Sequence, residues 1–328
     1  MPKGQINKKF NSKGEEVTSP ISVFDPKKFY EGTIMKNSEG DQFIIEDYRN
    51  TNEVQIRFLD EHQYTRLAYL SAIKAGSVKN VYRPLKYGGY IGDGPYGRKN
   101  DREAYMMWTH MRERVASIYT RQDYVTYRST SICDEWQNFQ IFAEWYYNEI
   151  KDLNPNYNYS LDKDILQWNS EYKIYGPDTC CIIPIELNSS LTNYQYAQSF
   201  GELPTGVINE LGKYRANPRI RDGKNTIRLD CDRSLFDTPE EAFEVYKTAK
   251  KKHLCEKADR YYNDHAISLR VRDAIYNIEF EPYTPEQLKR MDQIKSLRYK
   301  DRQLVEKDQM IEQKDQEIER LKALLDQK

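Results

Sequence analysis

The hydrophobic and polar positions of this chain change their period several times, and each change predicts a different element. Between residues 42 and 58 apolar and polar side chains alternate, which predicts two strands joined by a turn at Asn50–Asn52. From Asp101 apolar residues recur at every third or fourth position, which predicts an amphipathic helix of roughly five turns. Aromatic residues at the same spacing predict a second helix from Asp134 to Ile150.

Short apolar and polar segments then follow one another. Strands are predicted at Tyr159–Asp162 and Cys180–Pro184, and a helix is predicted to open near Glu186. Farther along, alternation through Lys213–Arg221 continues past an Asp-Gly turn into Thr226–Leu229. We therefore predict a ββα region followed by a three-stranded sheet.

Helical signals dominate the rest of the chain. Either Asp237 or Thr238 can cap a helix whose first turn contains Pro239, and its apolar face would pack behind the sheet. In the tail, one apolar residue recurs every seventh position while the companion positions carry lysine or aspartate. This pattern predicts a long charged helix, either in a weak parallel coiled coil or as a free or docking helix.

Together these elements predict an α+β multidomain fold. Its predicted parts are a disordered arm (1–28), a small β-module (29–97), a helical and ββα region (98–200), a three-stranded sheet with one helix (201–283) and the charged C-terminal helix (284–328).

Composition narrows the function classes. The formal net charge is −1 although 31% of the residues are charged, so a nucleic-acid surface has to be local. The five cysteines form no Cys-x-x-Cys pair, which favours reduced thiols over a zinc site. The N-terminus lacks an apolar segment and no apolar run reaches the length of a membrane span, so we expect a cytoplasmic protein without a membrane partner.

Basic residues gather on one face of the predicted three-stranded sheet. Such a face can enter the major groove, where arginine pairs with guanine edges and with phosphates. The alternative is a solvent-facing polar strand. The candidate DNA-binding residues are Arg215, Asn217, Arg219, Arg221, Lys224 and Arg228.

This region resembles the Apetala/ethylene-response-factor DNA-binding domain, which also occurs in mobile nucleases of phages. The resemblance rests on Thr205–Val207, Tyr214–Ala216 and Phe236–Phe243 and covers about residues 205–252. The connection Cys231–Leu235 is longer than the family pattern. The resemblance implies double-stranded DNA as the partner.

The preceding region resembles phage-type HNH homing endonucleases. The similarity runs through Cys133–Trp136, then Leu161–Asp164, then Tyr175–Cys180. The family implies a ββα finger that binds a divalent metal. On this match Asp162 would hold the ion, Asp164 would assist, and Asn188 would lie in the helix of the finger.

The catalytic histidine of that family is replaced here by Lys163, and no histidine occurs between His110 and His253. If the finger is active, Mg²⁺ or Mn²⁺ would stabilise the developing charge and Lys163 and Asn188 would be the catalytic candidates. We predict a DNA-binding protein of HNH type, located in the bacterial cytoplasm if phage-encoded. The alternatives are a DNA-binding regulator that does not cut, and an adaptor that forms homo-oligomers through its C-terminal helix.

Overall fold

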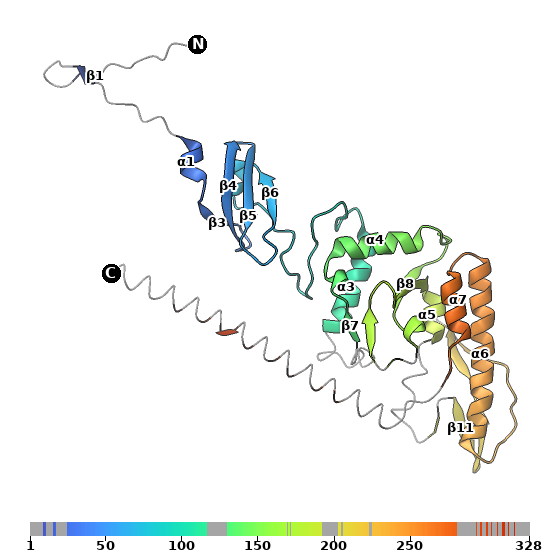
Figure 1. The fold of residues 1–328 in the computed structure, drawn as a ribbon. Helices are drawn as coiled ribbons and strands as arrows, with labels where there is room; N and C mark the ends of the chain where they lie inside the picture. Colours follow the sequence, from blue (N-terminus) through green and yellow to red (C-terminus); the bar gives the residue numbers. More distant parts are fainter. Residues whose placement is uncertain are drawn as a thin grey trace. The chain divides into compact units, whose positions relative to one another are not determined.

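The computed structural model describes residues 25–116, 130–168, 170, 172–191, 203–204, 206–222 and 225–280, the strand pair at 9–10 and 16–17, and single helical positions between 293 and 318. Over these residues the chain is α+β, as predicted, with several small sheets and helices of 5 to 25 residues (Figure 1). It forms two compact units, Met1–Arg83 and Pro84–Lys328.

The first unit contains a four-stranded antiparallel sheet in the order β3-β4-β5-β6. The predicted alternation places Phe43, Ile45 and Ile56 in a core that excludes solvent. The described elements are β1 (Lys9–Phe10), β2 (Glu16–Val17), α1 (Pro26–Tyr30), β3 (Ile34–Lys36), β4 (Gln42–Asn50), β5 (Glu53–Phe58), β6 (Thr65–Ala68) and α2 (Leu70–Lys74). The unit ends at residue 83, before the boundary predicted at residue 97.

Aromatic side chains form the first core of the second unit. Its helical elements are α3 (Arg102–Ala116), the 3₁₀ helix η2 (Glu135–Gln137) and α4 (Phe139–Ile150). Trp108 and Trp136 are buried, and the indole of Trp108 donates to the Trp136 carbonyl at 2.8 Å. The helix predicted from Asp134 is interrupted because Asn138 is extended and its side chain accepts from the Gln140 backbone N–H, which caps α4.

The predicted ββα order follows α4. Strand β8 (Tyr159–Asp162) pairs antiparallel with β10 (Cys181–Pro184), and α5 (Ile185–Leu191) begins directly after β10. The connection between the two strands contains the 3₁₀ helix η3 (Ile165–Gln167) and strand β9 (Lys173–Tyr175), which pairs parallel with β7 (Thr130–Ile132).

The structure corrects the prediction of one three-stranded sheet. Its strands are β11 (Val207–Glu210), β12 (Lys213–Ala216), β13 (Arg219–Asp222) and β14 (Asn225–Arg228). They form two separate hairpins, β11–β12 and β13–β14. The strand predicted to run continuously through residues 213–221 is interrupted at Pro218, which has no N–H to donate to a ladder.

The boundary predicted near residue 200 divides residues that share one core. Ile183 and Leu187 of the ββα region lie in the same buried cluster as Ala216 and Tyr246. Helix α6 (Pro239–Asn263) begins with a capping box in which Thr238 and Glu241 exchange hydrogen bonds, and α7 (Leu269–Tyr276) packs beside it (Figure 1). The ββα region therefore shares one core with the hairpin β11–β12 and with helices α6 and α7.

Most of the predicted C-terminal helix lies outside the described residues. The single positions that are described there are helical, and Met310, Ile311 and Ile318 are exposed. The coiled coil stays a prediction. Among the described helices, none combines the length and the apolar character needed to cross a membrane.

Candidate functional site

The ββα region places its candidate residues around one strand end. The register pairs Asp162, the last residue of β8, with Cys181, the first residue of β10. Helix α5 packs against both strands. Asn188 of α5 donates from its side-chain amide to the Ser160 hydroxyl of β8 at 3.0 Å. Asn188 therefore contacts β8 two residues before Asp162, and no hydrogen bond within the described residues joins it to Asp162, Lys163 or Asp164.

Asp162 has a structural task inside this region. Its Oδ1 accepts from the backbone N–H groups of Asp164 and Ile165, both at 2.8 Å, and so fixes the turn into η3. The residue is only 4% exposed. Burial, and after it the nearby charge of Asp164, raise the pKa of Asp162 to about 6.

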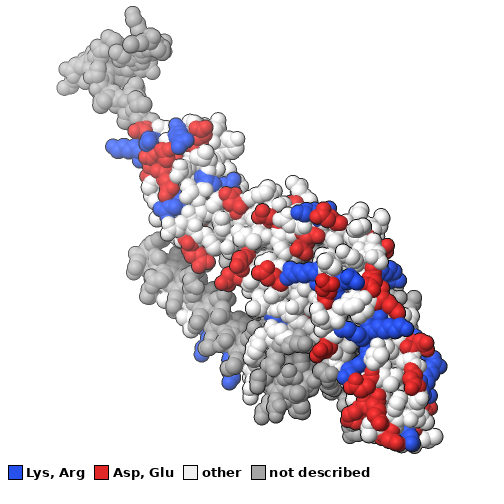
Figure 2. Space-filling view, turned by 45° about the vertical axis from the view of Figure 1, so that its right-hand side comes forward, with Lys and Arg blue, Asp and Glu red and all other residues white. Residues whose placement is uncertain are grey.

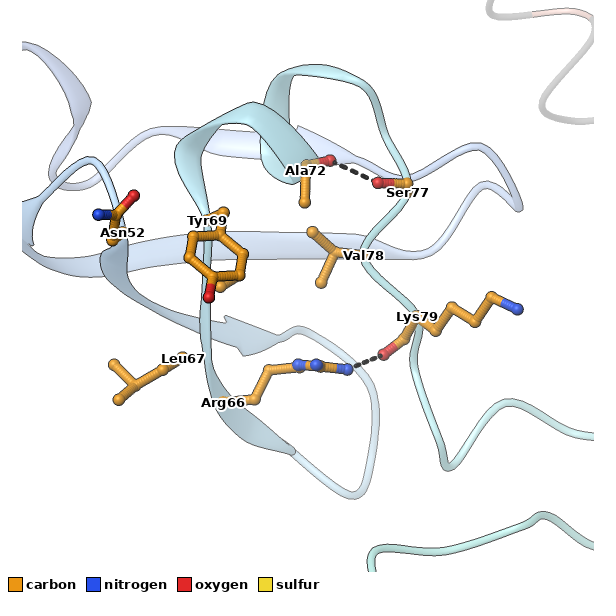
Figure 3. Close-up of a pocket in the computed structure, with 9 residues that line it drawn as sticks. Asn52, Arg66, Leu67, Tyr69, Ala72, Ser77, Val78 and Lys79 are labelled. Atoms are coloured by element: carbon orange, nitrogen blue, oxygen red, sulfur yellow. Dashed lines mark hydrogen bonds between the residues drawn. The ribbon is translucent and has the colours of Figure 1, made fainter. Parts of the chain in front are cut away.

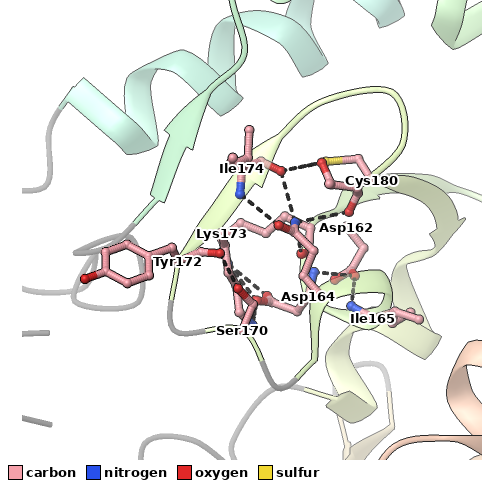
Figure 4. A network of polar contacts seen from close by, with 11 residues as sticks. Asp162, Asp164, Ile165, Ser170, Tyr172, Lys173, Ile174 and Cys180 are labelled. Atoms are coloured by element: carbon pink, nitrogen blue, oxygen red, sulfur yellow. Dashed lines mark hydrogen bonds and ion pairs between the residues drawn. The ribbon is translucent and has the colours of Figure 1, made fainter. Parts of the chain in front are cut away.

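Asp164 forms ion pairs with two lysines, Lys163 and Lys173, and Figure 4 shows it beside Lys173. The Lys163 Nζ is 2.9 Å from each of its carboxylate oxygens, and the Lys173 Nζ forms a second ion pair with it. Burial alone would raise the pKa of Asp164, but the two ammonium groups outweigh burial and hold this pKa well below its usual range. Burial lowers the pKa of Lys173, and Asp164 partly offsets that effect. We call Asp162, Lys163, Asp164 and Lys173 the carboxylate–lysine cluster.

Gln167 holds the connection between β8 and β10 around this cluster. Its amide nitrogen donates to the carbonyls of Lys163, Ile174 and Thr179, and its Oε1 accepts from the Ile174 N–H at 3.0 Å. The sequence had not singled out Gln167 or Lys173. No local sequence signal marks either residue, because their contacts reach across the connection between β8 and β10.

The donor set of this region does not fit a divalent metal. Such an ion binds oxygen atoms that are free to face it. The Asp162 carboxylate faces backbone N–H groups, and two ammonium groups occupy the positions around Asp164 that a cation would need. In the described part of the chain, no three His, Cys, Asp or Glu side chains are grouped to hold a metal. Lys163 is paired and 4% exposed, so its environment does not suit a general base.

The β13–β14 hairpin carries the second candidate site. Arg219 lies directly opposite Arg228, and both are exposed. Like charges in this position repel each other, and neither arginine forms an ion pair within the described chain. An anion between them would remove that repulsion.

The other predicted DNA contacts have different surroundings. Arg215 forms an ion pair with Glu210 at 2.8 Å, and its side chain is 27% exposed. The side-chain oxygen of Asn217 is buried without a hydrogen-bond partner. The side chains of Arg221 and Lys224 lie outside the described residues. On the face in Figure 2, basic and acidic side chains are interspersed, so the arginine pair is a local feature.

No protein-family model, curated protein or solved structure matches this chain.

Proposed function

We propose that the protein binds duplex DNA through the β13–β14 hairpin and does not hydrolyse it. The observation that carries the proposal is the cross-strand pair of Arg219 and Arg228, two exposed arginines at directly opposite positions of the hairpin. Guanidinium groups bind phosphate oxygens and guanine edges with paired hydrogen bonds. Helix α5 of the ββα region packs against β13 of this hairpin.

The carboxylate–lysine cluster favours binding over cleavage. Hydrolysis of HNH type would require a divalent ion at Asp162 and a base at the position of Lys163. Instead, the two lysines neutralise Asp164, and Asp162 anchors the turn into η3. The regulator class therefore fits the geometry better than the nuclease class.

DNA binding is tested by fluorescence anisotropy with a labelled duplex at several salt concentrations. Each lost phosphate contact lowers the slope of log affinity against log salt by about 0.9. We expect the double variant Arg219→Gln/Arg228→Gln to lose about 2 units of slope. The matched control is Arg102→Gln/Lys151→Gln, which removes two exposed charges from α3 and the end of α4 and should keep the wild-type slope.

Two results would contradict the proposal. DNA affinity that does not depend on salt, or equal salt slopes for the two double variants, would show that the hairpin does not contact DNA. Either result would favour the adaptor class. Nicking of supercoiled plasmid with Mg²⁺ or Mn²⁺ that disappears in Asp162→Asn would show hydrolysis. Tryptophan fluorescence of the variant provides the folding control.

A further inference from the structure

The first unit has an open sheet edge that DNA binding does not use. Strand β6 is the last strand of the order β3-β4-β5-β6, so among the described residues only one of its sides is paired. The Phe58 N–H donates to the Tyr64 carbonyl at 2.9 Å, and Arg66 is opposite Ile56. Because hydrogen-bonding direction alternates along a strand, Thr65 and Leu67 direct their N–H and C=O groups to the open side.

A groove of about 440 Å³ lies along this edge, between β6 and the segment Ser77–Lys79 (Figure 3). Two of its lining side chains, Arg66 and Lys79, are basic and none is acidic. Leu67 is 51% exposed and Tyr69 is 61% exposed, so apolar surface borders the groove. The groove therefore combines free strand hydrogen bonds, apolar contacts and positive charge.

Arg66 is incompletely satisfied in the groove. One terminal nitrogen donates to the Lys79 carbonyl at 3.3 Å, as Figure 3 shows. The Nε of the same guanidinium is buried and has no hydrogen-bond partner in the part of the chain that the structure describes. A buried N–H without an acceptor is unfavourable, and a carboxylate is the acceptor that guanidinium binds best.

We propose that this groove binds an extended acidic segment of a partner protein, which adds to β6 as a fifth strand. The backbone of the segment pairs with Thr65 and Leu67, and an acidic side chain reaches Arg66. Addition of a strand to an exposed sheet edge is a general mode of peptide recognition. Nucleic acid is the weaker candidate because phosphates only accept hydrogen bonds and cannot satisfy the outward carbonyls of β6.

The test uses the full chain and a fluorescein-labelled nonapeptide of alternating valine and glutamate. One control peptide has lysine in place of glutamate, and another has proline in place of the central valine. Saturable binding is expected below about 1 mM for the glutamate peptide only. Arg66→Gln should weaken binding about tenfold, because a charge-assisted hydrogen bond is lost. The control Lys36→Gln removes a charge from β3, the other edge of the sheet, and should change binding less than about twofold.

Leu67→Pro removes an outward N–H while the inward bonds of β6 remain, and it should weaken binding roughly fivefold. The proline-containing peptide tests the same backbone pairing without altering the protein. Equal binding of the proline and glutamate peptides, equal binding of the lysine peptide, or no saturation would overturn the proposal. If the Arg66→Gln variant binds a labelled DNA duplex more weakly than the wild type does, the groove belongs to the DNA interface, and this result would also overturn the proposal. Loss of DNA binding in the hairpin variants leaves this test unaffected.

Discussion

Replacement of Asp164 by asparagine should destabilise the second unit strongly. Lys163 and Lys173 have side chains that are 4% and 6% exposed, and both pair with this one carboxylate. The variant leaves two ammonium groups buried beside a neutral amide. Breaking a buried ion pair by removing one partner costs about 3–5 kcal/mol. Because 30% of the Asp164 side chain is exposed, we expect the lower end, about 3 kcal/mol.

The assay is urea unfolding followed by tryptophan fluorescence. It reports the second unit alone, because all four tryptophans lie after residue 83: Trp108, Trp136, Trp145 and Trp168. The control is Asp178→Asn, which removes an exposed carboxylate from the same connection between β8 and β10. It should change the free energy of unfolding by less than about 0.5 kcal/mol.

A double-mutant cycle isolates the ion pair from the general effect of the substitution. In a Lys173→Met background one of the two buried charges is absent, so Asp164→Asn should cost less. We expect a coupling free energy of at least about 1.5 kcal/mol between the two positions. A cost below about 1 kcal/mol for Asp164→Asn, or independent effects of the two substitutions, would refute a buried Lys–Asp–Lys arrangement.

Two further predictions concern buried groups of the second unit. The folded-state pKa of Asp162, about 6, is above its unfolded value of about 3.9, so stability should fall as pH rises from about 4 to about 6. In the Asp162→Asn variant, the free energy of unfolding in urea should not show this decrease between pH 4.5 and pH 7. An equal decrease in the wild type and the variant would contradict the raised pKa of Asp162. Gly206 has φ +76° and a Cβ there would overlap the buried Tyr246 ring, so Gly206→Ala should cost about 2 kcal/mol or more. If Gly206→Ala unfolds with the same free energy as the wild type, the close contact between Gly206 and the Tyr246 ring would be excluded.

Sequence patterns predicted the elements whose stability is mainly local. The burial of Trp108 in α3 and of Phe142 in α4 follows from three- and four-residue spacing, which places each on the apolar face of its own helix. The start of α6 at Pro239 follows from its cap, since Thr238 satisfies backbone N–H groups close in sequence. Strands β8 and β10 were also predicted, β10 as a short apolar run and β8 as a short segment that precedes a polar loop.

Features that depend on distant contacts were not predictable in the same way. Nothing near Lys173 in the sequence indicates that its ammonium group pairs with Asp164, nine residues earlier and across a loop. The alternation through residues 213–221 predicts one strand. It describes only the directions of the side chains and gives no information on backbone hydrogen bonds, so it does not reveal the break caused by the missing N–H of Pro218. As a result Arg215 and Arg219 belong to different hairpins, and only Arg219 is part of the exposed arginine pair.

Lys163 and Lys173 together set the charge of the carboxylate–lysine cluster. With both carboxylates ionised, the carboxylate–lysine cluster contains two negative and two positive groups, so it is neutral without a metal. A divalent ion added to it would introduce two uncompensated charges into a buried region, which is unfavourable. A histidine introduced at position 163 would remove only one of the two lysines, and Lys173 would still compete with a cation for Asp164. Both lysines would therefore have to change before Asp164 could face a metal.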